Sequence, residues 1–566
     1  MGIEDRLADQ NKDVLLYGWR DPVQPHPAAT VILVRDGSTG LEIMMTRRSM
    51  QASFAPGAYV FPGGRVDGAD HVLADSLSEG PSDDAAHRTT AYALAAIRES
   101  FEELGILFAR QPDGQWPDAE WVNSLDRTTP NGFAQLLATH QLQPALDSIH
   151  WFTHWITDRD LPKRFDTRFF VAHTPPDQQP IADQQEQFEP VWVNPAEALA
   201  RHEQGQFEMI FPTIRTLRHL LNYENAEQLL SQAATLGTSN GNPRWQSCPR
   251  AGWLNGEVVR FSENEAAYGE LEMVVPDGNL GHTLDWQHEP VPLLKHVTRI
   301  TAPNPGRMTG PGTNTYVISD AGQAIVIDPG PDHPEHLQRI ASLVTGKLVA
   351  IICTHSHPDH YPGAIPLRKL LKQPDSPILG RLAGPNFNPA WVFEPDRELQ
   401  DNDVIQCGEL TLRALHTPGH ASNHVCLLLE SDELLFSGDH ILNGSTTVID
   451  HPDGSMLDYM NSLHRLRQEP VRFILPAHGY VLGQPTEQID GLVRHRLKRE
   501  AKVLSAVEQS GTANIDELVL IAYNDVDPVL HQVAKRSLTA HLVKLVEEER
   551  INHDPEQATW SARQAQ

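Results

Sequence analysis

Residues 355–360 contain three histidines and one aspartate, which is a dense set of potential metal ligands. The apolar run 348–353 precedes them and predicts a buried strand that ends at the ligand-bearing loop. Imidazole and carboxylate groups together suit borderline or hard divalent ions. The cluster has no cysteine, the usual ligand of closed structural sites, so it favours an open, hydrolytic site that can serve two ions.

Three downstream segments supply further ligands. Residues 416–420 add His420, and the apolar runs that begin at 434 and 473 lead to Asp439 and His478. Open α/β folds place their sites at the carboxyl ends of strands, so these side chains are expected to meet the loop at 355–360. A single histidine is more simply explained as a core or surface residue, but an ordered set of ligands reverses that balance.

From about residue 290 to 483 these motifs, together with residues 303–306, 312–316 and 327–330, resemble the metallo-β-lactamase-like hydrolases. The resemblance implies an αββα fold with two zinc ions. It also implies two groups of ligands, His355, His357 and His420 in one and Asp359, His360 and His478 in the other, bridged by Asp439. Two ions about 3.5–4 Å apart lower the pKa of a bridging water, and Asp359 could accept its proton.

A second constellation lies in the amino-terminal third of the chain. Residues 91–107 predict an amphipathic helix, which Gly105 is expected to end. Glu99, Glu102 and Glu103 share another face of this helix. Three adjacent carboxylates repel one another unless a cation lies among them, although a solvated acidic face explains the helix alone equally well.

The surroundings of this helix resemble the Nudix hydrolases over about residues 27–221. Residues 98–106 match the second half of the Nudix motif, and residues 61–64 match its start. Carboxylate oxygens suit Mg²⁺ or Mn²⁺. The resemblance implies that Glu99, Glu102 and Glu103 hold such an ion against a diphosphate and act in catalysis, that Arg98 orients them, and that Gly63 and Gly64 contact substrate.

The Nudix motif is interrupted here. Its usual glutamate eight residues before the arginine is replaced by Thr90, and a polar insertion over residues 67–88 is long enough for a surface loop or lid. Such an insertion, and the spacing of residues 44–64, resemble the coenzyme A diphosphatase branch, although Ala52 and Ser53 replace its Leu-Arg pair. Arg48 could contact a phosphate or could be an ordinary strand residue.

The length of 566 residues predicts two to four domains. We expect a multidomain α/β protein, with a Nudix α/β/α sandwich in residues 1–225, a linker and leading strands in 226–290, and an αββα metallo-β-lactamase-like domain in 291–484. The turn-rich residues 237–243 are the expected linker, and residues 258–261 and 271–275 are expected to form strands. Residues 485–566 resemble the winged-helix module of a subgroup that includes an RNA-cleaving β-lactamase-like protein.

Composition limits the partners. No apolar run approaches the ~20 residues of a membrane span. The start of the chain has no apolar signal segment, and the four cysteines are scattered, which predicts a cytoplasmic protein with reduced thiols. The net charge of −29 argues against broad nucleic-acid binding, and the basic cluster at 494–499 is most simply a solvated helix face.

These patterns predict a bifunctional metal-dependent hydrolase. The first half would cleave a nucleoside-diphosphate-linked small molecule such as coenzyme A or acyl-CoA. The second half would hydrolyse an ester, thioester or phosphodiester. Two alternatives stay open: an RNA-processing enzyme that removes a cap and cuts the chain, and a nucleotide-sensing Nudix module that regulates the metallohydrolase. A homodimer is also possible from the sequence.

Overall fold

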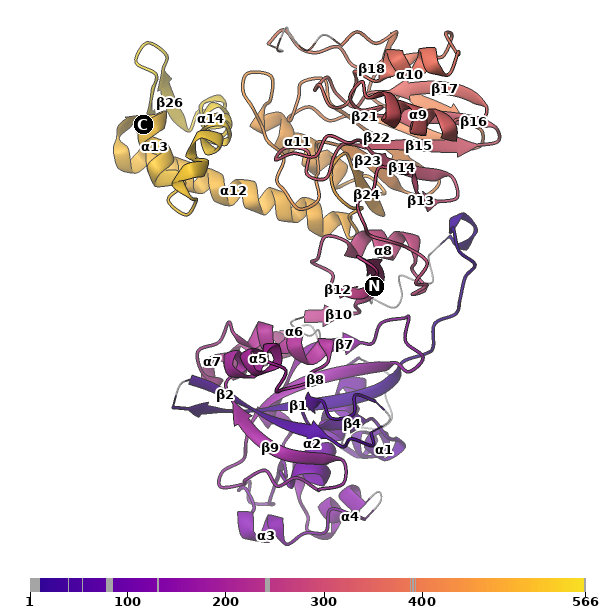
Figure 1. Cartoon of the computed structure of the whole chain (residues 1–566). Helices are drawn as coiled ribbons and strands as arrows, with labels where there is room; N and C mark the ends of the chain where they lie inside the picture. The colour runs from indigo at the N-terminus through magenta and orange to yellow at the C-terminus, as the bar shows by residue number, and fades with distance from the viewer. Residues whose placement is uncertain are drawn as a thin grey trace. The chain divides into compact units, whose positions relative to one another are not determined.

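The computed structural model describes residues 11–38, 40–52, 54–77, 85–129, 132–239, 245–386, 388, 391 and 393–563. The described chain forms two compact units (Figure 1). The first consists of residues 22–249, and the second combines residues 11–21 with everything from residue 250 onward. None of the described helices is both long enough and apolar enough to cross a membrane.

An eight-stranded sheet forms the centre of the first unit. Its main path runs in the order β10 (Trp245–Ser247), β7 (Ile149–Ile156), β8 (Phe165–His173), β1 (His26–Gly37), β2 (Gly40–Arg48) and β3 (Tyr59–Val60). β1 is parallel to β8 and antiparallel to β2. Two further strands branch from this path, β4 (Gly63–Arg65) beside β1 and β9 (Gln187–Val193) beside β2.

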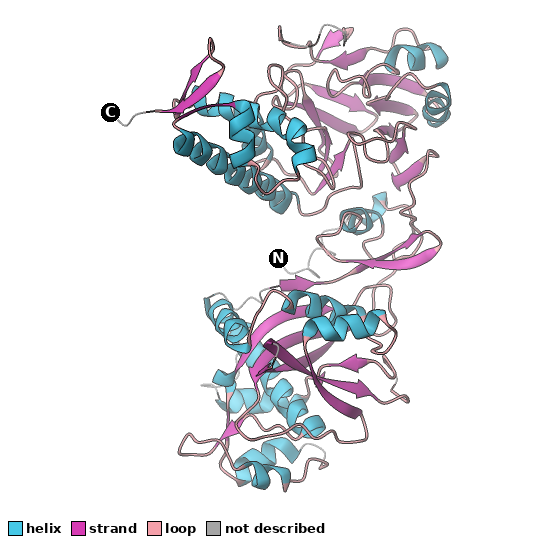
Figure 2. Ribbon diagram, turned by 60° about the vertical axis from the view of Figure 1, so that its left-hand side comes forward, coloured by secondary structure: helices cyan, strands magenta, loops and turns pink. Residues whose placement is uncertain are grey.

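Helices cover both faces of this sheet because its strands alternate apolar residues between the faces. In β1, Val31 and Leu33 pack with one group of helices, and Ile32 and Val34 pack with the other. The covering helices are α2 (Ala85–Leu104) on the first face and α5 (Pro195–Glu203), α6 (Phe211–Leu220) and α7 (Ala226–Ser239) on the second. The predicted α/β/α sandwich is therefore confirmed (Figure 2).

The segment predicted as an insertion, residues 67–88, is helical over much of its described length. It contains α1 (Gly68–Leu77) and the first turn of α2. Gly105 follows α2 with a φ of +70°, the left-handed conformation expected at a helix end. The remaining elements of this unit are β5 (Ala109–Arg110), α3 (Ala119–Asn123), α4 (Gly132–Thr139), β6 (Gln143–Pro144) and the 3-10 helix η3 (Leu146–Ser148).

Two sheets pack face to face in the second unit and share one apolar core. The seven-stranded sheet is ordered β13 (Val291–Leu294), β14 (Val297–Thr301), β15 (Asn314–Asp320), β16 (Gln323–Ile327), β17 (Lys347–Ile352), β18 (Ile378–Gly380) and β19 (Arg397–Glu398). The five-stranded sheet is ordered β20 (Val404–Cys407), β21 (Leu410–His416), β22 (Val425–Leu429), β23 (Leu434–Gly438) and β24 (Phe473–Pro476).

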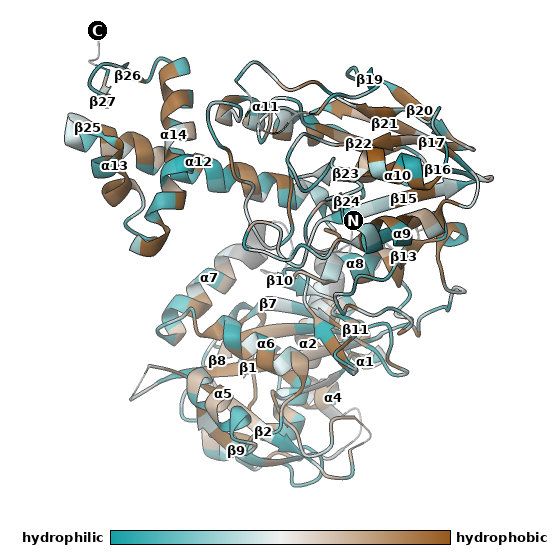
Figure 3. Cartoon of the chain, turned by 45° about the horizontal axis from the view of Figure 1, so that its top comes forward, coloured by the Kyte–Doolittle hydropathy of each residue, from teal (hydrophilic) through white to brown (hydrophobic). Residues whose placement is uncertain are grey.

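The outer faces of both sheets are covered by helices. α9 (Pro334–Leu343) and α10 (Ala364–Leu370) pack on the seven-stranded sheet. α11 (Met456–Leu466) and the start of α12 (Pro485–Ser510) pack on the five-stranded sheet. Figure 3 shows the apolar residues along β21 and β22 between these layers. The predicted αββα architecture is confirmed.

A small module with its own core follows the sandwich. Asn514 and Glu517 form a capping box at the start of its second helix, because each side chain accepts a hydrogen bond from the other's backbone N–H. The module is a winged helix, built from the end of α12, β25 (Thr512–Asn514), α13 (Ile515–Ala522), α14 (His531–Glu547), β26 (Ile551–Asp554) and β27 (Thr559–Ala562).

The segment predicted as linker and leading strands divides between the units. α7 and β10 belong to the first unit, whereas β11 (Arg250–Leu254) and β12 (Glu257–Phe261) form a separate two-stranded sheet in the second. The strand expected at 271–275 is wrong, because α8 (Tyr268–Val274) occupies these residues. All residues of α8 are buried, and a short apolar run does not distinguish a buried strand from a buried helix.

Residues 11–21 were expected in the Nudix domain, but they pack with the second unit. Leu15 lies in the core between the two sheets. The Tyr17 hydroxyl donates to Gly281 O at 2.6 Å, and Arg20 N donates to Asp277 Oδ2 at 2.8 Å. The first unit is therefore an insertion in the chain of the second. This short segment has no periodicity that could have revealed its partner.

Candidate functional site

The predicted ligands follow the ends of strands. In the seven-stranded sheet, β17 leads into residues 355–360. In the five-stranded sheet, β21, β23 and β24 point the same way and lead to His420, Asp439 and His478. The two sheets thus bring segments more than 100 residues apart to one edge of the sandwich, as the sequence predicts.

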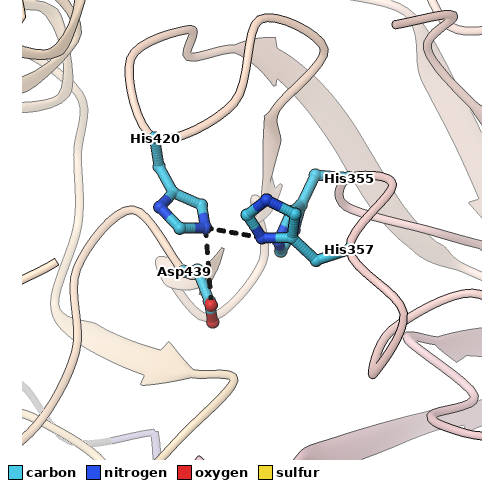
Figure 4. Close-up of side chains that lie close together, drawn as sticks. All are labelled: His355, His357, His420 and Asp439. Carbon is cyan, nitrogen blue, oxygen red and sulfur yellow. Dashed lines mark hydrogen bonds and ion pairs between the residues drawn. The ribbon is translucent and has the colours of Figure 1, made fainter. Parts of the chain in front are cut away.

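Four of the predicted ligands form one group. His355, His357, His420 and Asp439 offer ligand atoms that all lie within 4.8 Å of one another (Figure 4). His357 Nδ1 lies 2.9 Å from His355 Nε2 and 3.0 Å from His420 Nε2. Three imidazole nitrogens that converge with a carboxylate have the composition of a site for a divalent ion such as zinc.

The other three predicted ligands form a second group, and Asp439 lies between the two. Asp359, His360 and His478 offer atoms within 4.8 Å of one another. Asp439 turns Oδ2 towards His420 Nε2, at 3.6 Å, and Oδ1 towards His478 Nε2, at 3.2 Å. One carboxylate thus faces both groups with different oxygens, the arrangement that a bridging ligand requires.

In three of the candidate histidine ligands, a hydrogen bond fixes which nitrogen faces the site. The Nδ1 atoms of His420, His360 and His478 lie 2.6 Å from Val448 O, 2.9 Å from Asp328 Oδ2 and 3.2 Å from Gly312 O. A carbonyl or carboxylate oxygen can only accept, so Nδ1 donates and Nε2 is the nitrogen turned towards the site. Such outer partners are characteristic of metal-ligating histidines.

Two outer partners escaped the sequence analysis as functional residues. Asp328 accepts hydrogen bonds from Thr354 N at 2.7 Å and Thr354 Oγ1 at 2.8 Å, in addition to its contact with His360. The Thr313 hydroxyl donates to Asp359 Oδ2 at 2.9 Å. Both residues lie in segments used to recognise the family, but only their folded contacts reveal these roles.

The two groups differ electrostatically. Burial lowers the pKa of His357 to about 3 and holds the pKa of His355 well below its ordinary value, and neighbouring histidines add to the effect. Burial also opposes protonation of His478, but Asp439 and Asp359 outweigh it and raise the pKa to about 10. The first group therefore offers neutral imidazoles, and the second offers carboxylates that attract a cation.

Two buried atoms at this centre, His360 Nε2 and Asp439 Oδ1, lie within ion-pair distance of Asp359 and His478 but make no hydrogen bond in the described part of the chain. A buried polar atom without a hydrogen bond is costly, and these two atoms lie close to Asp359 and His478 of the second group. A metal ion would satisfy both. The residues present therefore fit two divalent ions.

The predicted Nudix residues meet in the first unit. A cavity of about 780 Å³ is lined by Arg48, Gly63, Gly64, Arg98, Glu99, Glu102 and Glu103, among others. Glu103 Oε2 accepts from Gly63 N at 2.9 Å, and Glu103 Oε1 accepts from Gln187 Nε2 at 2.8 Å. A Cβ on Gly64 would lie 2.2 Å from Glu99 Oε1, so any other residue here would displace the Glu99 carboxylate from its observed position.

Arg98 is held by a carboxylate that was not singled out from the sequence. Its Nε and Nη2 donate to Asp70 Oδ1 and Oδ2, both at 3.0 Å, and Asp70 is 2% exposed. The Nη1 atom of Arg98 donates to Glu99 at 2.8 Å and to Glu102 at 2.9 Å. Asp70 lies in the insertion, so the insertion supplies a buried carboxylate that holds Arg98.

The glutamates form a cation-attracting cluster. Burial raises the pKa of Glu99 to about 7 in spite of Arg98, and burial together with Glu99 holds the pKa of Glu103 well above its ordinary value. A divalent ion would relieve this repulsion. Arg48 Nε is buried and has no hydrogen-bond partner among the described residues. Arg48 lines the cavity, which suits a contact with an anionic substrate.

Family comparisons agree with this geometry. Residues 308–478 match the model of the metallo-beta-lactamase superfamily. The sequence is 31% identical to the atrochrysone carboxyl ACP thioesterase of Aspergillus chevalieri, over 44% of this chain and 80% of that protein. It is 30% identical to the beta-lactamase-like protein 2 homolog of Drosophila melanogaster, over 46% of this chain and 90% of that protein. The chain belongs to the metallo-β-lactamase superfamily.

This superfamily member carries two further domains. Residues 76–220 match the NUDT19 Nudix domain model, and residues 515–560 match the beta-lactamase associated winged helix domain model. A crystal structure of a NUDIX hydrolase from Alicyclobacillus acidocaldarius is 28% identical, covers 37% of this chain and 96% of that chain, and has a TM-score of 0.33. The protein is a hydrolase that joins two families of metal-dependent enzymes, as predicted.

Proposed function

We propose that the second unit hydrolyses an acyl thioester at a binuclear zinc centre. The observation that carries this proposal is the position of Asp439, whose two oxygens face two separate groups of ligands. The similarity to a relative named a thioesterase favours a thioester over an ester or a phosphodiester as the substrate. The boundaries near residues 290 and 484, which delimit the metallo-β-lactamase-like domain, are part of the same proposal.

The protein side chains have distinct roles in this reaction. Two ions bound here would polarise the thioester carbonyl and activate a water. Asp439 holds the two groups together, and the outer hydrogen bonds keep each histidine in its ligating orientation. Asp359 receives the proton of the water: burial opposes its ionisation, but His360 and His478 lower its pKa enough to keep it charged, and Thr313 orients it.

We propose that the first unit cleaves a nucleoside-diphosphate-linked substrate, with coenzyme A or acyl-CoA as the specific candidate. Glu99, Glu102 and Glu103 would hold Mg²⁺ or Mn²⁺, which neutralises the diphosphate. Arg98 orients two of these glutamates, and Arg48 contacts a phosphate. The cavity size supports a substrate larger than a diphosphate alone.

The thioesterase proposal is tested with the full chain after zinc supplementation. Metal analysis should find two ions per second unit, and acyl-CoA thioesters should be cleaved faster than a phosphodiester or single-stranded RNA. Asp439→Asn should reduce turnover by about 10²-fold or more because the bridge is lost. Asp458→Asn, which removes an exposed carboxylate from α11, is the matched control. Absence of bound metal in the wild type would refute the proposal.

The diphosphatase proposal has an independent test. Glu103→Gln should abolish Mg²⁺- or Mn²⁺-dependent cleavage of coenzyme A and should leave thioester hydrolysis unchanged, because the two sites lie in separate units. Cleavage is measured by chromatography of the nucleotide products. Stoichiometric nucleotide binding without turnover in the wild type would instead favour the sensor alternative, and cleavage of capped RNA alone would favour the RNA alternative.

A further inference from the structure

An irregular loop connects the bridging carboxylate to α11, over residues 440–455. Val448 O accepts the hydrogen bond that orients His420, at 2.6 Å. Thr447 Oγ1 lies 2.8 Å from Asp439 O and 3.0 Å from His440 O, and it donates to these carbonyls. The conformation of this loop therefore sets the orientation of one candidate ligand and the backbone of another.

An arginine of α12 reaches this loop. Arg496 is only 4% exposed, and its Nη2 donates to Thr447 O. The guanidinium lies 5.4 Å from the ring centre of Tyr459, which is the distance of a cation–π contact. The Tyr459 hydroxyl in turn donates to His440 O at 3.0 Å. Arg496 and Tyr459 thus hold the loop at two backbone carbonyls, those of Thr447 and His440.

Arg496 takes part in none of the ion pairs found in the described part of the chain, and its Nε lacks a hydrogen-bond partner there. A buried charge without an opposite charge is costly. Its neighbours Arg494 and Lys498 are exposed, so the basic cluster noted in the sequence does not form one charged surface. The contacts of Arg496 are with the loop beside the candidate metal centre.

The carboxyl-terminal module contacts the same loop a second time. Arg536 of α14 donates to Asp450 Oδ2 at 2.6 Å. Both side chains are about half exposed, so this ion pair contributes less than the buried contact. Ala540 of α14 is also buried in the core that contains Tyr459. The winged-helix module and the loop are therefore packed as one structure.

We propose that Arg496 is a positioning residue of the metallohydrolase site, an inference that rests on the proposed function of the second unit. It acts through Thr447 on the backbone of Asp439 and through Val448 on His420. The helix that leads into the winged-helix module is accordingly a support of the active site. Loss of Arg496 lets the loop relax, so that His420 and Asp439 no longer converge on one ion.

The test uses the full chain loaded with Co²⁺, whose visible absorption reports coordination geometry. Arg496→Met removes the guanidinium but keeps a side chain of similar length. Thr447→Val removes only the hydroxyl that donates to the carbonyls of Asp439 and His440. Both should alter the cobalt spectrum and lower kcat for thioester hydrolysis by about 10–100-fold, the usual effect of outer-shell substitutions at metal sites. KM should change little, and Arg496→Lys should restore part of kcat.

Lys498→Met is the matched control, because it removes an exposed positive charge from the same helix. Thermal unfolding identifies any variant that fails to fold. If Arg496→Met fails to fold, the result for Thr447→Val tests the inference. Folded variants with the wild-type spectrum and kcat would overturn this inference alone. A wild-type protein that binds no pair of ions would overturn the proposed function and this inference with it.

Discussion

At the residue scale, the candidate metal centre depends on atoms that never face the ion. Each of His360, His420 and His478 donates its Nδ1 proton to a fixed oxygen, so the opposite nitrogen is directed inward. Of the three acceptor oxygens, only that of Asp328 belongs to a carboxylate. This carboxylate also accepts hydrogen bonds from the backbone N–H and the hydroxyl of Thr354. Asp328 has a backbone φ of +48°, a left-handed conformation that asparagine also tolerates.

Asp328→Asn should therefore lower zinc affinity by about 10–100-fold without unfolding the protein. The amide keeps one acceptor oxygen, but its NH₂ group meets a donor at Thr354 or His360. Affinity is measured by competition with a chelator. Asp332→Asn, in the exposed turn that follows, is the control. Equal zinc affinity in the wild type and Asp328→Asn would contradict the role assigned to Asp328.

Asp70 provides the corresponding prediction for the Nudix cavity. Asp70→Asn leaves the guanidinium of Arg98 without its bidentate partner, and breaking a buried pair costs about 3–5 kcal/mol. Diphosphate cleavage should fall by about 10²-fold or more, because Arg98 then no longer orients Glu99 and Glu102. Asp113→Asn in an exposed turn is the control. Unchanged turnover by Asp70→Asn would show that the pair is dispensable.

At the scale of elements, a buried polar network attaches α8 to the sandwich. Glu270 is fully buried and accepts hydrogen bonds from both Nη atoms of Arg299. One of its carboxylate oxygens also lies 2.9 Å from His282 Nε2. Burial alone would raise the pKa of Glu270, but Arg299 and His282 outweigh it and lower the pKa to about 2. The charged carboxylate is therefore the form that stabilises the folded state.

The sign of the pH effect follows from this lowered pKa. The stabilisation by Glu270 is complete above its unfolded pKa and is lost as the pH falls towards 2, with a total of about 3 kcal/mol. Glu270→Gln should reduce the free energy of unfolding at pH 6 and much less at pH 3, as measured in urea. Glu257→Gln, on exposed β12, serves as control. A pH-independent difference would refute the assignment.

At the scale of the whole molecule, the Nudix unit is inserted in the chain of the metallo-β-lactamase unit. Residues 11–21 precede the insertion and still contribute Leu15 to the core of the second unit. In such a domain insertion, the stability of the metallo-β-lactamase unit does not depend on the inserted Nudix unit, provided that both segments of the metallo-β-lactamase unit are kept.

Deletion of residues 22–249, with a flexible Gly/Ser linker in their place, should therefore leave metal binding by the second unit intact. A protein that starts at residue 250 should be less stable by about 3 kcal/mol or more, because it loses the burial of Leu15 and the hydrogen bonds of Tyr17 and Arg20. Thermal unfolding and zinc content distinguish the two. Equal stability would contradict the assignment of residues 11–21.

The sequence by itself determined the three families, the layer architectures and both sets of candidate site residues. It could do so because ligands such as His355, His357 and His360 lie close together in the chain, and because strand and helix periodicities are local properties. The order of the remaining ligands along the chain, each after an apolar run, then predicted that they would meet at one edge.

Tertiary structure alone decided which side chains support those sites. Asp70 meets Arg98 from the insertion, Arg496 of α12 meets Thr447, and residues 11–21 join a core that is otherwise built after residue 250. None of these pairs has a characteristic spacing, since each depends on packing between distant segments. α8 was misread for the same reason: complete burial, which only the folded chain specifies, removes the polar face that marks a helix.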